Sequence, residues 1–204
     1  MRSSLSEWDA KHRAAAASAA AEPASFVREL LPLLPRGPAL DLACGTGRHT
    51  LLLAERHQPV TAVDGSSVAL EILEQRARAS HHTTGPMESS GTIAASQEGI
   101  RLAQVDLEHA ALPVNSFSLI LCVNYLQRSL FSQIQRALEP GGMLLFETHT
   151  RAQLEFPGGP KNPEYLLDPG ELRVGFPALR LLFYRELRAG KGIASLIAQK
   201  RRRG

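Results

Sequence analysis

The sequence has few cysteines, few aromatic residues and no long apolar run. Its two cysteines, Cys44 and Cys122, are too few to form a disulfide framework in 204 residues, and they lie in apolar surroundings, which indicates reduced thiols. Aromatic residues make up 5% of the chain, so a surface for stacking nucleic-acid bases is not expected. No apolar stretch is long enough to cross a bilayer, and the first residues lack the apolar centre of a secretory signal. We expect a soluble, cytoplasmic protein whose partners include neither nucleic acid nor a membrane.

Metal ligands and excess charge are also scarce. The side chains of His81 and His82 diverge because the two residues are adjacent, and no cysteine or acid cluster lies at ligand spacing, so no metal is expected. The formal net charge is +3, and much of the excess belongs to the run from Lys200 to Arg203. We interpret this run as a solvated chain end.

A glycine-containing turn is the most informative feature that is present. An apolar run at 39–43 carries Asp41 and leads into Gly45-Thr46-Gly47, after which an amphipathic segment begins. Glycine allows turn conformations that a Cβ disfavours, and it lets a ligand approach the main chain. A second apolar run ends in Asp64, where a carboxylate can hold the hydroxyls of a ribose. This pattern predicts a nucleotide-type cofactor, either NAD(P) or S-adenosylmethionine.

The residues around the turn favour S-adenosylmethionine. A dinucleotide fingerprint has glycine or alanine three residues after its second glycine, but here Thr50 occupies that position. Asp41 next to the turn would repel a pyrophosphate, whereas it can accept hydrogen bonds from a cationic amino-acid group or orient the loop. An NAD(P)-dependent oxidoreductase remains the alternative.

Apolar patterns of strand and helix type alternate along the chain. Such alternation predicts an α/β fold with a parallel sheet and helices on both of its faces. A terminal pair of strands with a glycine-containing turn reads as an antiparallel hairpin. The expected strands are 39–43, 60–63, 101–105, 118–123, 143–148, 179–187 and 193–198, and the expected helices are 5–21, 26–35, 47–57, 67–79 and 128–138. We predict an N-terminal helical lid at 1–35 and one domain at 36–204, with a mobile insertion at 81–99.

The motifs resemble those of the class I S-adenosylmethionine-dependent methyltransferases, over about residues 36–198 and in the order that this family uses. The resemblance implies a Rossmann-like, doubly wound, seven-stranded sheet with a terminal antiparallel hairpin. It also implies S-adenosylmethionine as cofactor, with Asp64 at the ribose and with Asp106 and the N–H of Leu107 at the adenine edge. Ala43 stands where many members have a further glycine. The expected cofactor-binding residues are Asp41, Ala43, Gly45, Gly47, Asp64, Gly65, Ser66, Asp106, Leu107, Asn124, Tyr125 and Trp8.

Three segments are similar to the small TehB-like, tellurite-resistance and thiopurine-type methyltransferases. They are Glu7 to His12, Asp41 to His49, and Asn162 to Leu172, although His12 stands where those proteins more often have tyrosine. This resemblance implies a methyltransferase (EC 2.1.1.-) with a small-molecule acceptor such as a metalloid oxyanion or a thiol. Trp8, the only tryptophan, is expected to close over the cofactor. A protein that holds S-adenosylmethionine without turnover is a third hypothesis.

Residues after the fourth and fifth strands are candidates for handling the acceptor. The segment Val123 to Gln127 lacks the prolines typical of enzymes that methylate nucleobase amines, so a small acceptor is favoured. His149 is a candidate base because its pKa is ordinarily near neutrality, and it can alternatively hold the following loop. We predict catalytic roles for His149 and Arg151 beside a Gly/Pro-rich entry loop at 157–163, which otherwise is a plain exposed connection.

Overall fold

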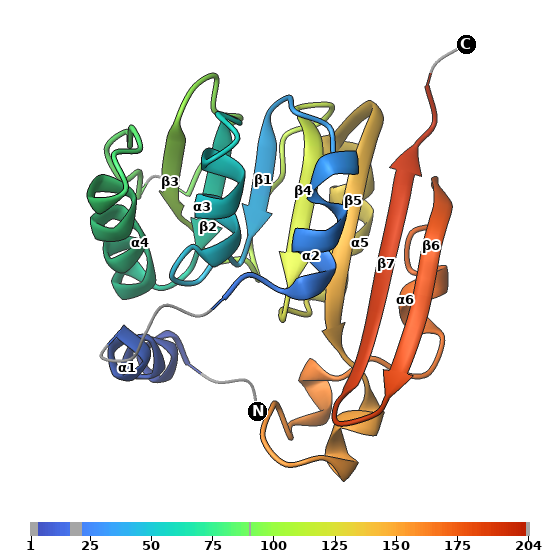
Figure 1. Cartoon of the computed structure of the whole chain (residues 1–204). Helices are drawn as coiled ribbons and strands as arrows, with labels where there is room; N and C mark the ends of the chain where they lie inside the picture. Colours follow the sequence, from blue (N-terminus) through green and yellow to red (C-terminus); the bar gives the residue numbers. More distant parts are fainter. Residues whose placement is uncertain (1–3, 17–21, 90, 203–204) are drawn as a thin grey trace.

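A seven-stranded mixed sheet forms the centre of the molecule (Figure 1). The computed structural model describes residues 4–16, 22–89 and 91–202. The strand order is β3-β2-β1-β4-β5-β7-β6, with β7 antiparallel to both β5 and β6 and the other pairings parallel. The strands are β1 Ala39–Leu42, β2 Val60–Asp64, β3 Ile100–Gln104, β4 Phe117–Val123, β5 Leu138–His149, β6 Leu179–Arg188 and β7 Gly192–Lys200. The predicted α/β class and the terminal hairpin are confirmed.

Helices cover both faces of the sheet (Figure 1). On one face lie α2 (Ser25–Leu30), α3 (Arg48–Ala54) and α4 (Ser67–Ala79); on the other lie α5 (Phe131–Ala137) and α6 (Glu171–Val174). Short 3-10 turns are η1 Leu31–Leu33, η2 Arg128–Leu130, η3 Arg151–Glu155 and η4 Pro163–Tyr165. The central strands β1 and β4 are buried along their whole length, as expected for parallel strands covered on both faces.

The N-terminal segment, expected as one lid, divides into two parts. Helix α2 packs Phe26 and Val27 against Leu119 and Leu121 of β4 and belongs to the core. Helix α1 (Leu5–Ala16) lies apart from the sheet, below the carboxyl ends of the strands (Figure 1). The remainder of the expected 5–21 helix lies outside the described residues. Only α1 therefore has the position of a lid.

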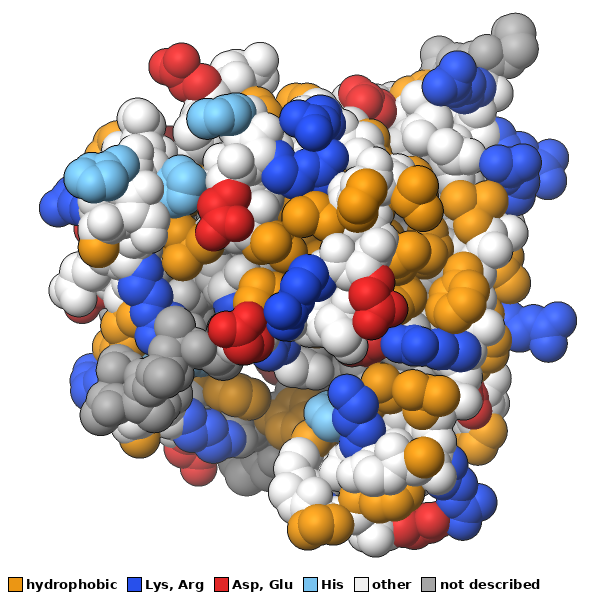
Figure 2. All heavy atoms as spheres, in the orientation of Figure 1, with side chains coloured by type: hydrophobic (Ala, Val, Ile, Leu, Met, Phe, Trp, Pro, Cys, Tyr) orange, Lys and Arg blue, Asp and Glu red, His pale blue; other side chains and the backbone are white. Residues whose placement is uncertain are grey.

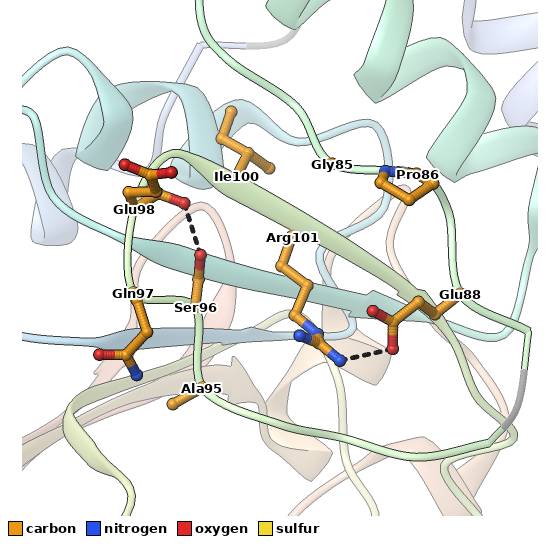
Figure 3. Close-up of a pocket in the computed structure, with 9 residues that line it drawn as sticks. All are labelled: Gly85, Pro86, Glu88, Ala95, Ser96, Gln97, Glu98, Ile100 and Arg101. Carbon is orange, nitrogen blue, oxygen red and sulfur yellow. Dashed lines mark hydrogen bonds and ion pairs between the residues drawn. The ribbon is translucent and has the colours of Figure 1, made fainter.

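The segment expected to be a mobile insertion runs along β3. The backbone N–H groups of Gly85 and Glu88 donate to the carbonyls of Ile100 and Leu102, at 3.0 and 2.9 Å. A cavity of about 290 Å³ lies between this segment and β3, and two of its lining residues, Arg101 and Glu88, form an ion pair of 2.5 Å (Figure 3). The segment lacks apolar periodicity because it pairs through its backbone at the edge of the sheet. Its mobility stays a prediction.

The ends of several elements differ from the prediction. Strand β5 begins at Leu138, five residues before the predicted start at 143. It passes through Gly141 and Gly142 with a register shift opposite Phe117. The short elements η3, η4 and α6 were not predicted. Within the described residues, no helix is long and apolar enough to cross a membrane.

Candidate active site

A cleft of about 900 Å³ opens at the carboxyl ends of the parallel strands. Its walls come from α1, from the ends of β1 to β5 and from the segment 159–165, and Figure 2 shows the hollow at the lower edge of the molecule. Ligands of doubly wound sheets bind at this edge. The volume is within the range of about 300 to 1,000 Å³ typical of small-molecule sites. This cleft is the candidate active site.

The two glycines of the first turn have different surroundings. Gly45 has a φ of +54°, and a Cβ built there would meet only His12 Cε1, at 3.5 Å. Its outer side therefore faces the cleft. Gly47 has a φ of +85° and precedes α3, and a Cβ there would come within 2.1 Å of Leu73 Cδ1 on α4. Gly47 does not line the cleft; it allows the turn to pack against α4.

Asp64, at the end of β2, lines the cleft and is tied to both neighbouring loops. Its two carboxylate oxygens accept hydrogen bonds from the N–H groups of Gly45, at 2.8 Å, and Ser66, at 2.9 Å. Burial raises the pKa of this carboxyl, and the two backbone donors oppose that shift. Each oxygen of a carboxylate has two lone-pair sites, so capacity for further donors remains.

Asp41 lies behind the turn instead of in the cleft. Its side chain is buried in β1 and accepts a hydrogen bond of 2.6 Å from the hydroxyl of Thr50. Burial raises the pKa of Asp41 to about 6, although the Thr50 hydrogen bond and the charge of Arg48 lower it. Thr50, at the position of a third glycine, thus has a structural partner in Asp41. The Arg48 side chain lines the cleft itself.

Asp106 and Leu107 follow β3 and line the cleft as expected. The Asp106 carboxylate accepts a hydrogen bond from the Glu108 N–H at 2.9 Å and lies 2.7 Å from Nδ1 of His109. These contacts hold the pKa of Asp106 below its ordinary value. The loop after β3 therefore presents an ionised carboxylate near the cleft.

The opposite wall comes from the ends of β4 and β5. Asn124 has a φ of +61°, and its N–H donates to the Glu147 carbonyl at 2.8 Å, which turns the chain toward Tyr125. Thr148 and His149 complete this wall. Burial lowers the pKa of His149, so its imidazole is neutral at pH 7.

The expected positive mouth of the cleft is weaker than predicted. Arg151 is not among the residues that line the cleft, and its guanidinium forms an ion pair with Asp168. Lys161 does line the cleft, but its ammonium donates to the backbone carbonyls of Gln153, at 3.0 Å, and Phe156. The helical turn η3, which was not predicted, turns Arg151 toward Asp168.

Helix α1 forms the remaining wall and is fastened to α4. The hydroxyl of Ser66 donates to the Asp9 carboxylate at 2.5 Å and also caps the N-terminus of α4. Ser66 does not itself line the cleft. Trp8 does, with 38% of its surface exposed and the Lys11 ammonium 4.1 Å from its ring centroid.

Most of the residues selected from the sequence meet in this cleft. Nine of the twelve expected cofactor residues line it, together with His149; Asp41, Gly47 and Ser66 lie behind it. Sequence reasoning missed His12, Arg48 and Tyr165. The position of Arg48 directly after the glycine turn was an available signal, whereas the path of 159–165 depends on tertiary packing. The described residues contain no group of three or more potential metal ligands.

Comparison with known proteins gives the family. A family model described as "Methyltransferase domain" matches residues 40–146, from β1 to β5. The malonyl-[acyl-carrier protein] O-methyltransferase of Serratia marcescens is 27% identical over 161 residues, which cover 76% of this chain and 57% of that protein. The putative methyltransferase YqeM of Bacillus subtilis is 29% identical over 123 residues, which cover 56% of this chain and 43% of the relative. The chain thus spans about half the length of these curated relatives.

Solved structures share the fold. TehB from Haemophilus influenzae superposes with a TM-score of 0.68 at 19% identity, over 90% of this chain and 64% of that chain. A methyltransferase from Mesorhizobium loti superposes with a TM-score of 0.64 at 19% identity, over 87% of this chain and 98% of that chain. Because the family model covers more than half of the sequence, the chain belongs to the methyltransferase domain family, and its fold is that of the class I methyltransferases, whose methyl donor is S-adenosylmethionine.

Proposed function

We propose that this protein transfers a methyl group from S-adenosylmethionine to a small-molecule acceptor. The observation that carries the proposal is the cleft: Gly45 leaves its wall open, and the carboxylates of Asp64 and Asp106 stand at neighbouring strand ends. Family membership supports the same reaction and disfavours the NAD(P) alternative. The free, buried cysteines are compatible with a reducing compartment such as the cytoplasm.

The described residues fit an adenosine group at one end of the cleft. Asp64 retains lone pairs for the hydroxyls of a ribose, and the segment at Asp106 and Leu107 offers a carboxylate and a backbone N–H for an adenine edge. Ala43, Gly45 and Gly65 line the cleft with little or no side chain, although a Cβ on Gly65 would meet Leu5 Cδ2 of α1 at 2.8 Å. Asn124, Tyr125 and Trp8 are proposed as further walls of the cofactor site. Asp41, Gly47 and Ser66 support the site from behind and are not proposed to touch the cofactor.

The acceptor is proposed to enter between α1 and the segment 159–165. There Lys11, His12 and His149 line the cleft. A thiol or a metalloid oxyanion remains the proposed acceptor class, on the similarity of three sequence segments to the TehB-like proteins. The Serratia marcescens relative is named as an O-methyltransferase, so oxygen acceptors belong in the same screen.

Methyl transfer requires the protein mainly to align the acceptor with the methyl group and to provide the acceptor in its deprotonated form. S-adenosylmethionine supplies a methyl group already activated on a sulfonium. The chain contributes orientation of the acceptor, exclusion of water by α1, and a proton acceptor, for which we propose His149. For Arg151 we propose a structural role in place of the catalytic one: its ion pair with Asp168 stabilises the chain beside the cleft.

Binding and turnover test the proposal in two steps. Calorimetry should detect binding of S-adenosylmethionine and no comparable binding of NADH; the reverse result would overturn the assignment. Release of S-adenosylhomocysteine in a screen of thiols, hydroxyl compounds and metalloid oxyanions then measures transfer. In that assay His149→Gln should slow turnover about a hundredfold or more, within the usual contribution of a general base, and leave cofactor affinity unchanged. Binding without turnover of any acceptor class would favour a non-catalytic protein.

A further inference from the structure

Gln153, which sequence reasoning did not select, is one of the most constrained side chains near the cleft. It lies in η3, is 2% exposed and bonds to two segments of the chain. Its Nε2 donates to the Gly158 carbonyl at 3.1 Å, and its Oε1 accepts from the Gly192 N–H at 3.0 Å. The same Oε1 lies 3.1 Å from Nδ1 of His149.

These partners fix which way the amide points. A flipped amide would bring two oxygens together at Gly158 and two N–H donors together at Gly192, losing both hydrogen bonds. The oxygen of Gln153 must therefore face His149, and an oxygen can only accept. Nδ1 of His149 consequently carries the proton in this contact, and the lone pair of a neutral imidazole is left on Nε2.

Three glycines of the neighbouring loops make room for Gln153. A Cβ on Gly159 would come within 2.9 Å of the Gln153 amide nitrogen, and a Cβ on Gly192 would come within 2.2 Å of its backbone nitrogen. Gly158 supplies the carbonyl acceptor. The Gly/Pro-rich loop, interpreted from the sequence as an acceptor entrance, thus encloses Gln153 and fixes its position.

We propose that Gln153 is a positioning residue that holds His149 as the Nδ1–H tautomer and presents Nε2 to the cleft, so that His149 takes the proton from an acceptor that still carries one, namely a thiol or a hydroxyl. The inference rests on the proposed methyl transfer and narrows its substrate class. The acceptor's S–H or O–H bond breaks and its proton goes to Nε2, its electron pair bonds the incoming methyl group, and the departing thioether sulfur keeps the pair of the broken carbon–sulfur bond.

The charges around His149 keep the ring neutral at working pH. Burial is the main effect and lowers its pKa, and the ammonium of Lys191 in the β6–β7 turn lowers it further. The Gln153 hydrogen bond, the Gly192 carbonyl and the carboxylate of Glu147 on β5 act in the opposite direction, without reversing the shift. A thiol has an ordinary pKa of about 8.5 and is mostly protonated at pH 7, so such a base serves it. A fully ionised metalloid oxyanion would not need one.

The first test reads the tautomer directly in the protein without cofactor. Imidazole ¹⁵N correlation spectra distinguish Nδ1–H from Nε2–H, and the His149→Gln spectrum assigns the signal. Gln153→Met removes the acceptor with little change in volume. Gln133→Met is the matched control, because the Gln133 amide also bridges a backbone N–H, of Leu112, and a carbonyl, of Ala110, but among the described residues it forms no hydrogen bond with a histidine side chain. We expect Nδ1–H in the native protein and in the control, and loss of that preference in Gln153→Met.

The second test uses turnover of a thiol or hydroxyl acceptor. Gln153→Met should lower kcat about tenfold with unchanged affinity for S-adenosylmethionine, and combining it with His149→Gln should slow the enzyme no further than His149→Gln alone. Gln153→Glu keeps an oxygen opposite Nδ1 but loses the hydrogen bond to Gly158, so it should restore kcat in part and move the acidic limb of the pH profile upward. A folded Gln153→Met protein with native kcat and pH profile would overturn the role.

The outcomes separate the two proposals. An Nε2–H signal in the native protein overturns the role of Gln153 even if the enzyme methylates thiols. Failure to bind S-adenosylmethionine overturns the proposed function, whereas the tautomer, measured without cofactor, is unaffected by that result. If the enzyme methylates metalloid oxyanions efficiently and His149→Gln does not slow that reaction, the proposal that the acceptor is a thiol or a hydroxyl is overturned.

Discussion

The N–H of Gly45 donates a hydrogen bond of 2.8 Å to the Asp64 carboxylate, which joins the first turn of the sheet to the end of its second strand. The two residues are 19 positions apart in the sequence. Parallel strands β1 and β2 bring them together, with Leu42 opposite Val63. The loop that leaves room for a ligand and the acid that would bind it are therefore one hydrogen-bonded unit.

Asp64→Ala should weaken binding of S-adenosylmethionine by about 1.5 to 3 kcal/mol, because charge-assisted hydrogen bonds to the ribose are lost. Calorimetry measures this difference. Asp64→Asn keeps the shape of the side chain but not its charge. Its affinity for S-adenosylmethionine should lie between those of the native protein and Asp64→Ala. Native affinity in a folded Asp64→Ala protein would move the ribose elsewhere.

The two glycines of the turn should respond differently to substitution. Gly47→Ala forces a methyl group against Leu73 and should reduce the free energy of unfolding by about 1 to 3 kcal/mol. Gly45→Val is also strained by its φ of +54°, but its side chain points into the cleft, so it should in addition abolish cofactor binding while most of the helicity survives. Denaturant unfolding and calorimetry on both variants check the pair. Native affinity for S-adenosylmethionine in a folded Gly45→Val protein would contradict this assignment.

Asp41 should make the protein less stable as pH rises. Its pKa is raised in the folded state from 3.8 to about 6, so folding favours its protonated form. The contribution is fully present below about pH 4 and is lost as pH rises through about 6; the difference amounts to about 3 kcal/mol.

Asp41→Asn removes this titration. The free energy of unfolding of the variant minus that of the native protein should be about 3 kcal/mol larger at pH 7.5 than at pH 4, because only the native protein loses stability over this range. Denaturant titrations at the two pH values give the difference, in which the other titrating groups cancel. A pH-independent difference would show that Asp41 does not carry the raised pKa.

Trp8 should report closure of α1. Because its ring lines the cleft and is partly exposed, binding of S-adenosylmethionine should change its fluorescence. Removal of residues 1–20 should lower affinity without unfolding the domain, since the core is formed by the sheet with α2 to α6. An unresponsive Trp8 together with full affinity of the shortened chain would leave α1 no role in binding.

Much of the fold could be predicted from local patterns. The strands at 39–42 and 117–123 are continuous apolar runs because both of their faces are buried, and α4 spans the predicted residues 67–79. The start of β5 was missed because Pro140, Gly141 and Gly142 read as a turn, although a register shift accommodates them in the sheet. The backbone pairing of 83–88 was missed because it leaves no side-chain pattern.

The site was predictable where strand ends define it and not where packing does. The positions of Asp64 and Asp106 at the cleft could be predicted because acids directly after apolar strands lie at one edge of the sheet. The ion pair of Arg151 could not be predicted because its partner, Asp168, is 17 residues away on a segment with no periodic pattern. Gln153 was overlooked because its significance depends on Gly158 and Gly192, which only the folded chain brings together.

The segment beside β3 also limits how copies of this protein can aggregate. Its backbone occupies hydrogen-bonding groups of β3 at Ile100, Leu102 and Gln104, so that margin of the sheet is covered. The other margin, β6, pairs on one side only, with β7, and carries exposed Leu181 and Phe183. If two copies pair along β6, neither then offers a second open strand. We therefore expect folded copies to pair through the open edge of β6 and not through β3 while the 83–88 segment stays in place.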